Sequence, residues 1–243
     1  MTDVFYEKFQ NELSLLSINL EKNQLEQFYK YYEILVEWNK VMNLTTITEM
    51  EEVISKHFVD SLSLVKILDD LGTEVYSIID VGTGAGFPGI PLKIAFPQLN
   101  ITLMDSLNKR INFLNEVINN LGLEDICAIH GRAEDLGRDI NHRERYDLCV
   151  SRAVANLSTL SEYCMPFVKV GGCFIPYKSG KIEEELGEAK HAVFLLGGKI
   201  EDTERFLLPG TEAERLLIKI NKVSGIPKKY PRKAGLPSKE PLK

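Results

Sequence analysis

The chain has 243 residues, of which 44% are hydrophobic and 26% are charged, as in a soluble globular protein with one domain and an addition, or two small domains. No apolar run approaches the ~20 residues that cross a bilayer, and the N-terminus lacks a basic stretch followed by an apolar one, so we expect a cytoplasmic protein with neither a membrane span nor a secretion signal. The four scattered cysteines, Cys127, Cys149, Cys164 and Cys173, indicate buried free thiols rather than a metal site.

The net charge of −6 conceals an uneven distribution. Residues 221–243 contain seven basic residues and one acidic residue and so carry +6, which leaves −12 on the rest of the chain. A basic end on an acidic body indicates contact with a polyanion. The alternative is a solvated, disordered tail, and charge alone does not decide between the two.

Residues 1–72 are predicted to be a helical extension packed on a core formed by residues 73–243. Within residues 24–40, apolar side chains recur at helical spacing. They are Leu25, Phe28, Tyr29, Tyr32, Leu35, Val36 and Trp38. Residues 48–51 predict a capping box that opens a second helix with Val53, Ile54 and Phe58 inward. The aromatic stripe indicates helix packing rather than a ligand site.

From residue 76 onward, predicted strands and helices alternate. The predicted strands are residues 78–81, 100–105, 126–130, 146–151, 172–177, 199–208 and 215–223. The predicted helices between them are residues 90–95, 109–121, 157–168 and 182–196. Alternation of this kind predicts an α/β, Rossmann-like fold with a mostly parallel sheet of seven strands. The last two strands have no helix between them, which predicts an antiparallel C-terminal edge.

The most informative segment is residues 76–89, where a strand, a glycine-rich turn and a helix follow one another, as in nucleotide-binding α/β units. The spacing Gly84-x-Gly86-x-x-Gly89 matches a dinucleotide site, whereas Gly82-x-Gly84-x-Gly86 matches the looser turn of S-adenosylmethionine-dependent methyltransferases. Pro88 removes an amide that a pyrophosphate would use, and the acid at position 80 favours a cationic cofactor. We therefore favour S-adenosylmethionine.

Two further segments follow predicted strands at the edge of the sheet where ligands bind. Asp105 ends the second strand and could accept hydrogen bonds from ribose hydroxyls; the alternative is that it caps the following helix, which Ser106 or Asn108 could do instead. Residues 131–135 follow the third strand and could contact the adenine, or could simply begin a helix.

Seven segments, taken in order, resemble one family. They are residues 38–45, 56–61, 80–89, 105–110, 132–134, 151–155 and 229–239. The chain is similar over nearly its whole length to the bacterial ribosomal RNA small-subunit methyltransferase G family, also called glucose-inhibited division protein B. One departure is the pair Pro176-Tyr177 before Lys178, where the family pattern has small or aliphatic residues.

The resemblance implies methyl transfer from S-adenosylmethionine to N7 of one guanosine in small-subunit ribosomal RNA. It also implies cofactor contacts for Gly82, Phe87, Ala133, Glu134 and Arg152. With the residues argued from the turn and the second strand, the predicted cofactor-binding set is Gly82, Gly84, Gly86, Phe87, Asp105, Ala133, Glu134 and Arg152. The expected partner is the small-subunit RNA or the subunit itself, and the protein is expected to be a monomer.

Guanine N7 carries a lone pair and no proton, so its attack on a methyl group needs no general base, and catalysis would consist mostly of positioning. Arg152 and Lys178 are the positioning candidates, and the target base must be unpaired or flipped out because the major groove of A-form RNA is closed to a protein pocket. The alternatives are methylation of a protein or small molecule, a non-enzymatic RNA-binding assembly factor, and a nicotinamide-dependent oxidoreductase.

Contacts with RNA are expected at two places. His57 shares a helix face with Asp60 and either makes a local hydrogen bond or contacts RNA. The C-terminal cations would contact phosphates, and Tyr230 among them could stack on a base. The predicted RNA-binding residues are His57, Lys229, Arg232, Lys233 and Lys239.

Overall fold

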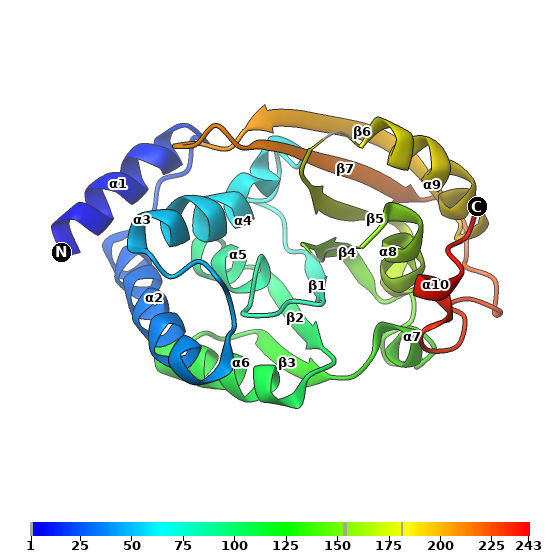
Figure 1. Ribbon diagram of the computed structural model, residues 1–243, viewed down its shortest axis with the longest axis horizontal. Helices are drawn as coiled ribbons and strands as arrows, with labels where there is room; N and C mark the ends of the chain where they lie inside the picture. The colour runs from blue at the N-terminus through cyan, green and yellow to red at the C-terminus, as the bar shows by residue number, and fades with distance from the viewer. Residues whose placement is uncertain (1, 153–154, 181) are drawn as a thin grey trace.

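The computed structural model describes residues 2–152, 155–180 and 182–243. Seven strands form one sheet in the order β3-β2-β1-β4-β5-β7-β6 (Figure 1). The strands are β1 (Ser77–Val81), β2 (Asn100–Asp105), β3 (Ile126–His130), β4 (Tyr146–Ser151), β5 (Val168–Lys178), β6 (Gly198–Leu207) and β7 (Glu214–Lys222). The first five strands pair in parallel, and β7 pairs antiparallel with both β5 and β6. The predicted α/β fold with an antiparallel C-terminal edge is confirmed.

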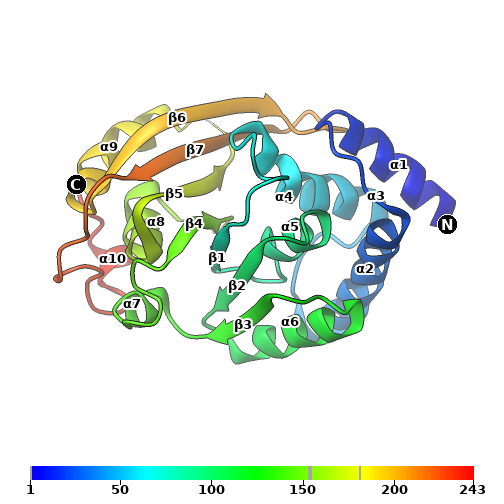
Figure 2. The same ribbon diagram turned by 180° about the vertical axis from the view of Figure 1, so that it is seen from behind.

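Helices surround this sheet, and those of the N-terminal extension gather at one end of the molecule (Figures 1 and 2). The α-helices are α1 (Thr2–Ser14), α2 (Lys22–Met42), α3 (Met50–Val53), α4 (Asp60–Leu62), α5 (Gly89–Ala95), α6 (Asn108–Leu121), α7 (Ala133–Leu136), α8 (Leu157–Cys164), α9 (Glu183–Leu195) and α10 (Leu236–Lys239). Other helical turns are the π-helix η1 (Ile54–Val59) and the 3₁₀ helices η2 (Ser63–Lys66) and η3 (Met165–Phe167). The predicted helix over residues 157–168 is thus shorter than expected, because β5 begins at Val168.

The N-terminal helices share one hydrophobic core with the sheet, without a break at the predicted boundary near residue 72. One detail of the prediction was wrong, and one residue was missing from it. The buried face of α2 also includes Tyr31, which the predicted set omitted, while Tyr29 and Tyr32 are half-buried and pack against the core. The capping box lies at Glu21 and Gln24 and opens α2, whereas the residue before α3 makes no side-chain cap.

The chain after β7 is folded against α7 and α8 at the opposite end of the molecule from α1 (Figure 1). One guanidinium, that of Arg143, anchors this segment through backbone carbonyls. It donates to the carbonyl oxygens of Gly137, Ile226, Pro227 and Tyr230. The expectation that the Tyr230 ring stacks on a base was wrong, because the side chain is buried in a hydrophobic core cluster. The alternative of a solvated, disordered tail does not fit this packing either.

All four cysteines are free, but the expectation of buried thiols holds only in part, because Cys127 on β3 is exposed. Among the described residues, no group of three or more histidine, cysteine, aspartate or glutamate side chains could hold a metal ion. No helix in the described part of the chain has the length and apolar character to cross a bilayer.

Candidate active site

The glycine turn joins β1 to α5 and is tied to the neighbouring strand β2. The backbone N–H groups of Gly82 and Thr83 both donate to the Met104 carbonyl, at 2.9 and 3.0 Å. The backbone φ angles of Gly82, Gly84 and Gly86 are 73°, 62° and 94°. Side chains rarely adopt this left-handed region, so the turn depends on glycine at these positions.

The glycines of the turn have different roles. A Cβ at Gly84 would meet no atom within 4 Å, so this residue borders open space. A Cβ at Gly86 would lie 2.7 Å from the Tyr31 hydroxyl, and one at Gly89 would lie 2.3 Å from Leu103. Gly86 and Gly89 therefore serve packing. Gly82, which is exposed, and Gly84 form the cradle that a ligand can approach, while cofactor contact by Gly86 stays a prediction.

Asp80 lies beneath the turn and is not exposed on its open side. Its carboxylate is fully buried, and Oδ2 accepts hydrogen bonds from Thr83 Oγ1 at 2.6 Å and the Gly89 N–H at 2.9 Å. Burial raises the pKa of Asp80 to about 7, although the two hydrogen bonds act in the opposite direction and lower it. The predicted attraction of a cationic cofactor is thus replaced by a structural role: Asp80 fixes both ends of the turn.

This raised pKa makes the stability of the protein depend on pH. Because the folded-state pKa of Asp80 lies above its unfolded value, the stabilising contribution is complete below about pH 4 and is lost as the pH rises through about 7. We expect the free energy of unfolding of the wild type to fall by about 3 kcal/mol relative to Asp80→Asn between about pH 5 and pH 8. Chemical denaturation across this range measures it. The exposed Asp135→Asn variant is the control, and parallel curves for wild type and Asp80→Asn would contradict the expectation.

Asp105 connects the turn to the end of β2. Its side chain is 2% exposed and accepts hydrogen bonds from the Gly84 N–H, the Leu107 N–H and Arg110 Nη1 at 3.0, 2.9 and 3.1 Å. A carboxylate offers about four acceptor positions, so capacity for one further donor is left. Leu107, not Asp105, Ser106 or Asn108, occupies the N-cap position of α6. Ribose binding by Asp105 stays a prediction.

The loop after β3 reaches the same edge of the sheet. Ala133 begins α7 and is half-buried. The Glu134 side chain is buried and accepts a hydrogen bond from the Gly235 N–H at 2.8 Å. Glu134 thus holds the C-terminal segment. If this loop contacts the adenine, as predicted, backbone atoms and Ala133 are the available groups. The sequence analysis did not consider Leu107, an apolar residue that is 53% exposed on the neighbouring loop.

Phe87 stands between the turn and the N-terminal extension. Its ring stacks on the His57 ring, with centroids 4.4 Å apart, and lies 5.6 Å from the Arg152 guanidinium carbon. His57 Nε2 lies 2.9 Å from Thr45 Oγ1. Burial, together with the nearby Arg152 charge, lowers the pKa of His57 to about 3, so the ring is neutral. Instead of a hydrogen bond on its helix face, the His57 ring pairs with Thr45, which precedes that helix; an RNA contact by this buried ring stays a prediction.

Arg152, at the end of β4, clamps the N-terminal extension to the sheet. Its guanidinium donates to the carbonyls of Lys56 and His57 at 2.9 and 3.1 Å and to Ser61 Oγ at 2.9 Å. It also forms an ion pair with Asp60 at 2.9 Å. These partners lie in and just after the π-helix η1, a type of helix that is frequent at functional sites. Direct contact of Arg152 with the cofactor stays a prediction, and its neighbours 153 and 154 in the resembling motif lie outside the described residues.

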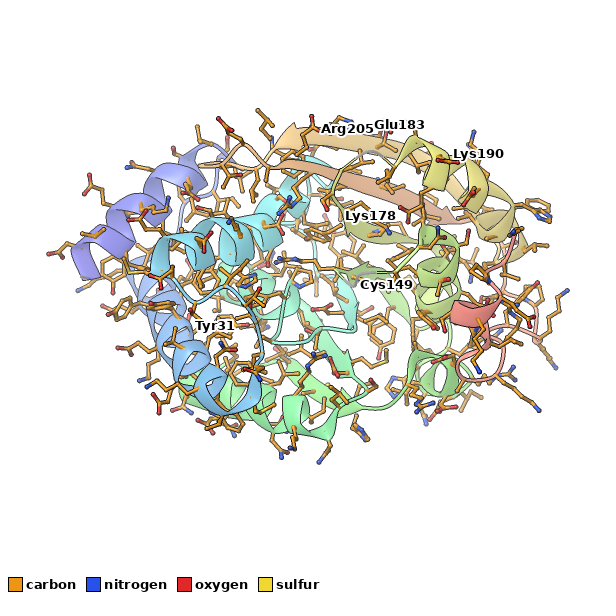
Figure 3. All side chains as sticks on the ribbon, viewed as in Figure 1. Tyr31, Cys149, Lys178, Glu183, Lys190 and Arg205 are labelled. Atoms are coloured by element: carbon orange, nitrogen blue, oxygen red, sulfur yellow. The ribbon has the colours of Figure 1, made fainter. Side chains whose placement is uncertain are left out.

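Lys178 ends β5 and contacts Ala155 and Glu185 (Figure 3). Its Nζ donates to the Ala155 carbonyl at 2.5 Å and to Glu185 Oε1 at 2.6 Å. The departure Pro176-Tyr177 does not disturb the strand: Pro176 pairs in register with Ser151. Tyr177 is buried, and its hydroxyl donates to the Ser61 carbonyl at 2.7 Å, which again ties the extension to the sheet.

A cavity of about 630 Å³ opens beyond the ends of β4 and β5. It is lined by Asp60, Arg152, Ala155, Asn156, Tyr177, Lys178, Ser179, Glu185 and Arg215. Asp60 is shared there between two guanidiniums, because Arg215 Nε donates to its Oδ1 at 2.8 Å. The sequence analysis did not identify Arg215 on β7, because nothing local distinguishes it from the other charged residues of that strand. The site therefore has two parts: a glycine cradle and a polar cavity joined by Arg152.

The family described as rRNA small subunit methyltransferase G matches residues 24–213 of the chain. A ribosomal RNA small subunit methyltransferase G from Lachnoclostridium phytofermentans is 60% identical over 230 residues, which cover 95% of this chain and 94% of that protein. The chain belongs to this family. A second family member, from Alkaliphilus metalliredigens, is 52% identical over 94% of this chain and 95% of its own length.

Solved structures with low sequence identity share the fold of this methyltransferase G family member. The structure of M. jannaschii TYW2 in complex with AdoMet has a TM-score of 0.52 and 17% identity, covering 68% of this chain and 77% of that one. A mutant of MtNAS in complex with S-adenosylmethionine has a TM-score of 0.52 and 15% identity, covering 84% of this chain and 73% of that one. The predicted family, the methyltransferase class and the cofactor, S-adenosylmethionine, are confirmed.

Proposed function

We propose that this protein transfers a methyl group from S-adenosylmethionine to N7 of one guanosine in small-subunit ribosomal RNA, in the cytoplasm and as a monomer. The observation that carries the proposal is the arrangement at the carboxyl edge of the sheet, where a cradle with open space at Gly84 adjoins a cavity lined by two arginines and a lysine. The names of the relatives, which describe ribosomal RNA small subunit methyltransferases, support the choice of substrate.

In this proposal, the cradle binds the cofactor and the cavity receives the flipped guanosine. Gly82 and Gly84 let the backbone approach the cofactor, and Leu107 and Ala133 offer apolar contact to its adenine. Bound there, S-adenosylmethionine supplies an electrophilic methyl group. Because N7 carries no proton, no residue has to act as a base, and the clamps made by Arg152 and Lys178 keep the two halves of the site in place for an in-line approach.

RNA phosphates would be held by the exposed lysines of the C-terminal segment. Lys229, Lys233 and Lys239 are exposed, and Lys229 Nζ lies over the Tyr230 ring at 5.1 Å. Arg232 differs, because its guanidinium pairs with the buried Glu162 carboxylate at 2.7 Å. We therefore assign phosphate contacts to the lysines first and an anchoring role to Arg232.

Replacing Lys233 and Lys239 together by alanine tests this surface. Each lost phosphate contact is expected to reduce the slope of log affinity against log salt by about one, while S-adenosylmethionine affinity stays unchanged. Filter binding of small-subunit RNA at several salt concentrations measures the slope. Lys22→Ala, an exposed lysine at the start of α2, is the control. Deleting the whole segment is unsuitable, since it would leave Glu134 and Glu162 without partners. Equal slopes for the double variant and wild type would exclude these lysines from the interface.

The test of the function is a transfer assay with methyl-labelled S-adenosylmethionine. Small-subunit particles and bare small-subunit RNA from cells lacking this protein are the acceptors, and the modified nucleoside is mapped afterwards. We expect N7-methylguanosine at one position. Label in a protein or small molecule instead would favour a different acceptor, and absence of label from both acceptors would contradict the proposed substrate.

A further inference from the structure

The N-terminal helix α2 grips the cofactor turn and the helix after it at two points. The hydroxyl of Tyr31 donates a hydrogen bond to the carbonyl oxygen of Ala85, in the middle of the glycine turn. Near the start of α2, Gln24 Nε2 donates to the carbonyls of Ile94 and Ala95 at 2.7 and 3.1 Å, where α5 ends. The unit formed by the turn and α5 is thus held at both ends by a helix that precedes the Rossmann-like sheet.

The Tyr31 contact is built into the packing around the turn. The side chain is fully buried on the side of α2 that faces the sheet (Figure 3), and Gly86 has no side chain where the Tyr31 hydroxyl lies. The Tyr31 ring also lies 5.5 Å from the ring of Phe87 and 5.5 Å from that of Phe58. Tyr31 therefore contacts the turn at Ala85, Gly86 and Phe87, directly after the open cradle residue Gly84.

We propose that Tyr31 is a positioning residue of the cofactor site, whose hydroxyl fixes the Ala85 peptide and so holds Gly84 and Phe87 in the cofactor-binding geometry. This inference rests on the proposed function only in that the cradle binds S-adenosylmethionine. The N-terminal extension then serves the cofactor site through the backbone of the turn, in addition to any contact it makes with RNA.

The hydroxyl is suited to this task because it donates at every physiological pH. Burial, with the nearby Asp80 charge, raises the pKa of Tyr31 well above its ordinary value, so the proton stays on the oxygen. The acceptor is equally constrained: a buried carbonyl that loses its donor leaves an unsatisfied polar group, which shifts the local backbone or admits water. A shift at Ala85 would move its neighbour Gly84, whose N–H is bonded to Asp105.

Tyr31→Phe tests the proposal because it removes one oxygen atom and keeps the ring. We expect the dissociation constant for S-adenosylmethionine, measured by titration calorimetry well below the unfolding temperature, to rise about tenfold, with KM for the cofactor raised more than kcat is lowered. Tyr32→Phe is the matched control: it lies next in the same helix, is half-buried, and its hydroxyl donates to the Thr48 carbonyl at 3.5 Å.

Rescue separates the hydrogen bond from packing. 4-Aminophenylalanine at position 31 places an N–H donor opposite the Ala85 carbonyl and is expected to bring the dissociation constant back to within about threefold of wild type. A Tyr31→Phe variant that melts earlier but binds the cofactor within about twofold of wild type would reduce Tyr31 to a structural role and overturn the proposal. A variant equal to Tyr32→Phe in both measurements would overturn it as well.

If Tyr31→Phe does not fold, hydrogen exchange of the wild-type protein, with and without S-adenosylmethionine, tests the proposal instead. Cofactor binding is then expected to slow exchange in residues 28–35 of α2 as well as in residues 82–90, although no part of α2 lines the cradle. Protection confined to residues 82–90 would overturn the proposal. Because these measurements use the cofactor alone, failure of RNA methylation leaves them intact, whereas a wild type that binds no S-adenosylmethionine would refute the proposed function itself.

Discussion

Replacing Arg232 by alanine is expected to destabilise the protein by about 3–5 kcal/mol, because it leaves a buried carboxylate without its cation. The Glu162 side chain is 0% exposed, and Arg232 donates to it through Nε at 2.9 and 3.0 Å and through Nη2 at 2.7 Å. Thermal unfolding should move down by roughly 6–20 °C for a chain of this size. Denaturant unfolding measures the free energy directly.

The adjacent Lys233→Ala variant is the matched control for this substitution. Lys233 is exposed, so its loss is expected to change stability by less than about 0.5 kcal/mol while it weakens RNA binding. Adding Glu162→Gln to Arg232→Ala removes the unpaired charge and should recover part of the loss. An Arg232→Ala variant within about 1 kcal/mol of wild type would mean that this ion pair does not anchor the C-terminal segment.

Gly84→Ala and Gly86→Ala are expected to fail in different ways, although the two glycines belong to one motif. At Gly84 the new Cβ costs only the strain of a left-handed backbone, about 1–2 kcal/mol, and projects into the open cradle, so cofactor affinity should fall at least about tenfold in a folded protein. At Gly86 the Cβ would lie 2.5 Å from Ile90 Cδ1, so we expect a loss of about 2–5 kcal/mol.

Gly122→Ala is the matched control for Gly84→Ala. Gly122 has the same φ of 62° and the same open surroundings, but it ends α6 away from the cradle. Calorimetric titration with S-adenosylmethionine and thermal unfolding should therefore show equal strain in the two variants and a loss of affinity in Gly84→Ala alone. Equal affinity in both variants would place the cofactor elsewhere.

Much of the fold follows from local sequence signals. The alternation of strand and helix segments after residue 76 predicts every strand, and the absence of a helix between the last two strands predicts the antiparallel edge. The glycine turn was also predicted correctly, because glycine itself indicates a left-handed backbone at these positions. Helix α2 was predicted as a helix, but Tyr31 was left out of its apolar set, although the spacing of Gln24, Phe28, Tyr31 and Leu35 fits one stripe.

The sequence by itself determined the family, through the resemblance of its ordered motifs, and also the order of the elements and the choice of cofactor, which rest on local spacing and on the glycine turn. Only the tertiary structure decided what the charged and aromatic residues do. Arg232 faces Glu162 across 70 positions of the chain, and Tyr31 meets Ala85 across 54. Whether a cation binds phosphate or a buried carboxylate depends on the partner that folding brings to it, and that partner lies too far along the chain for any local pattern to identify.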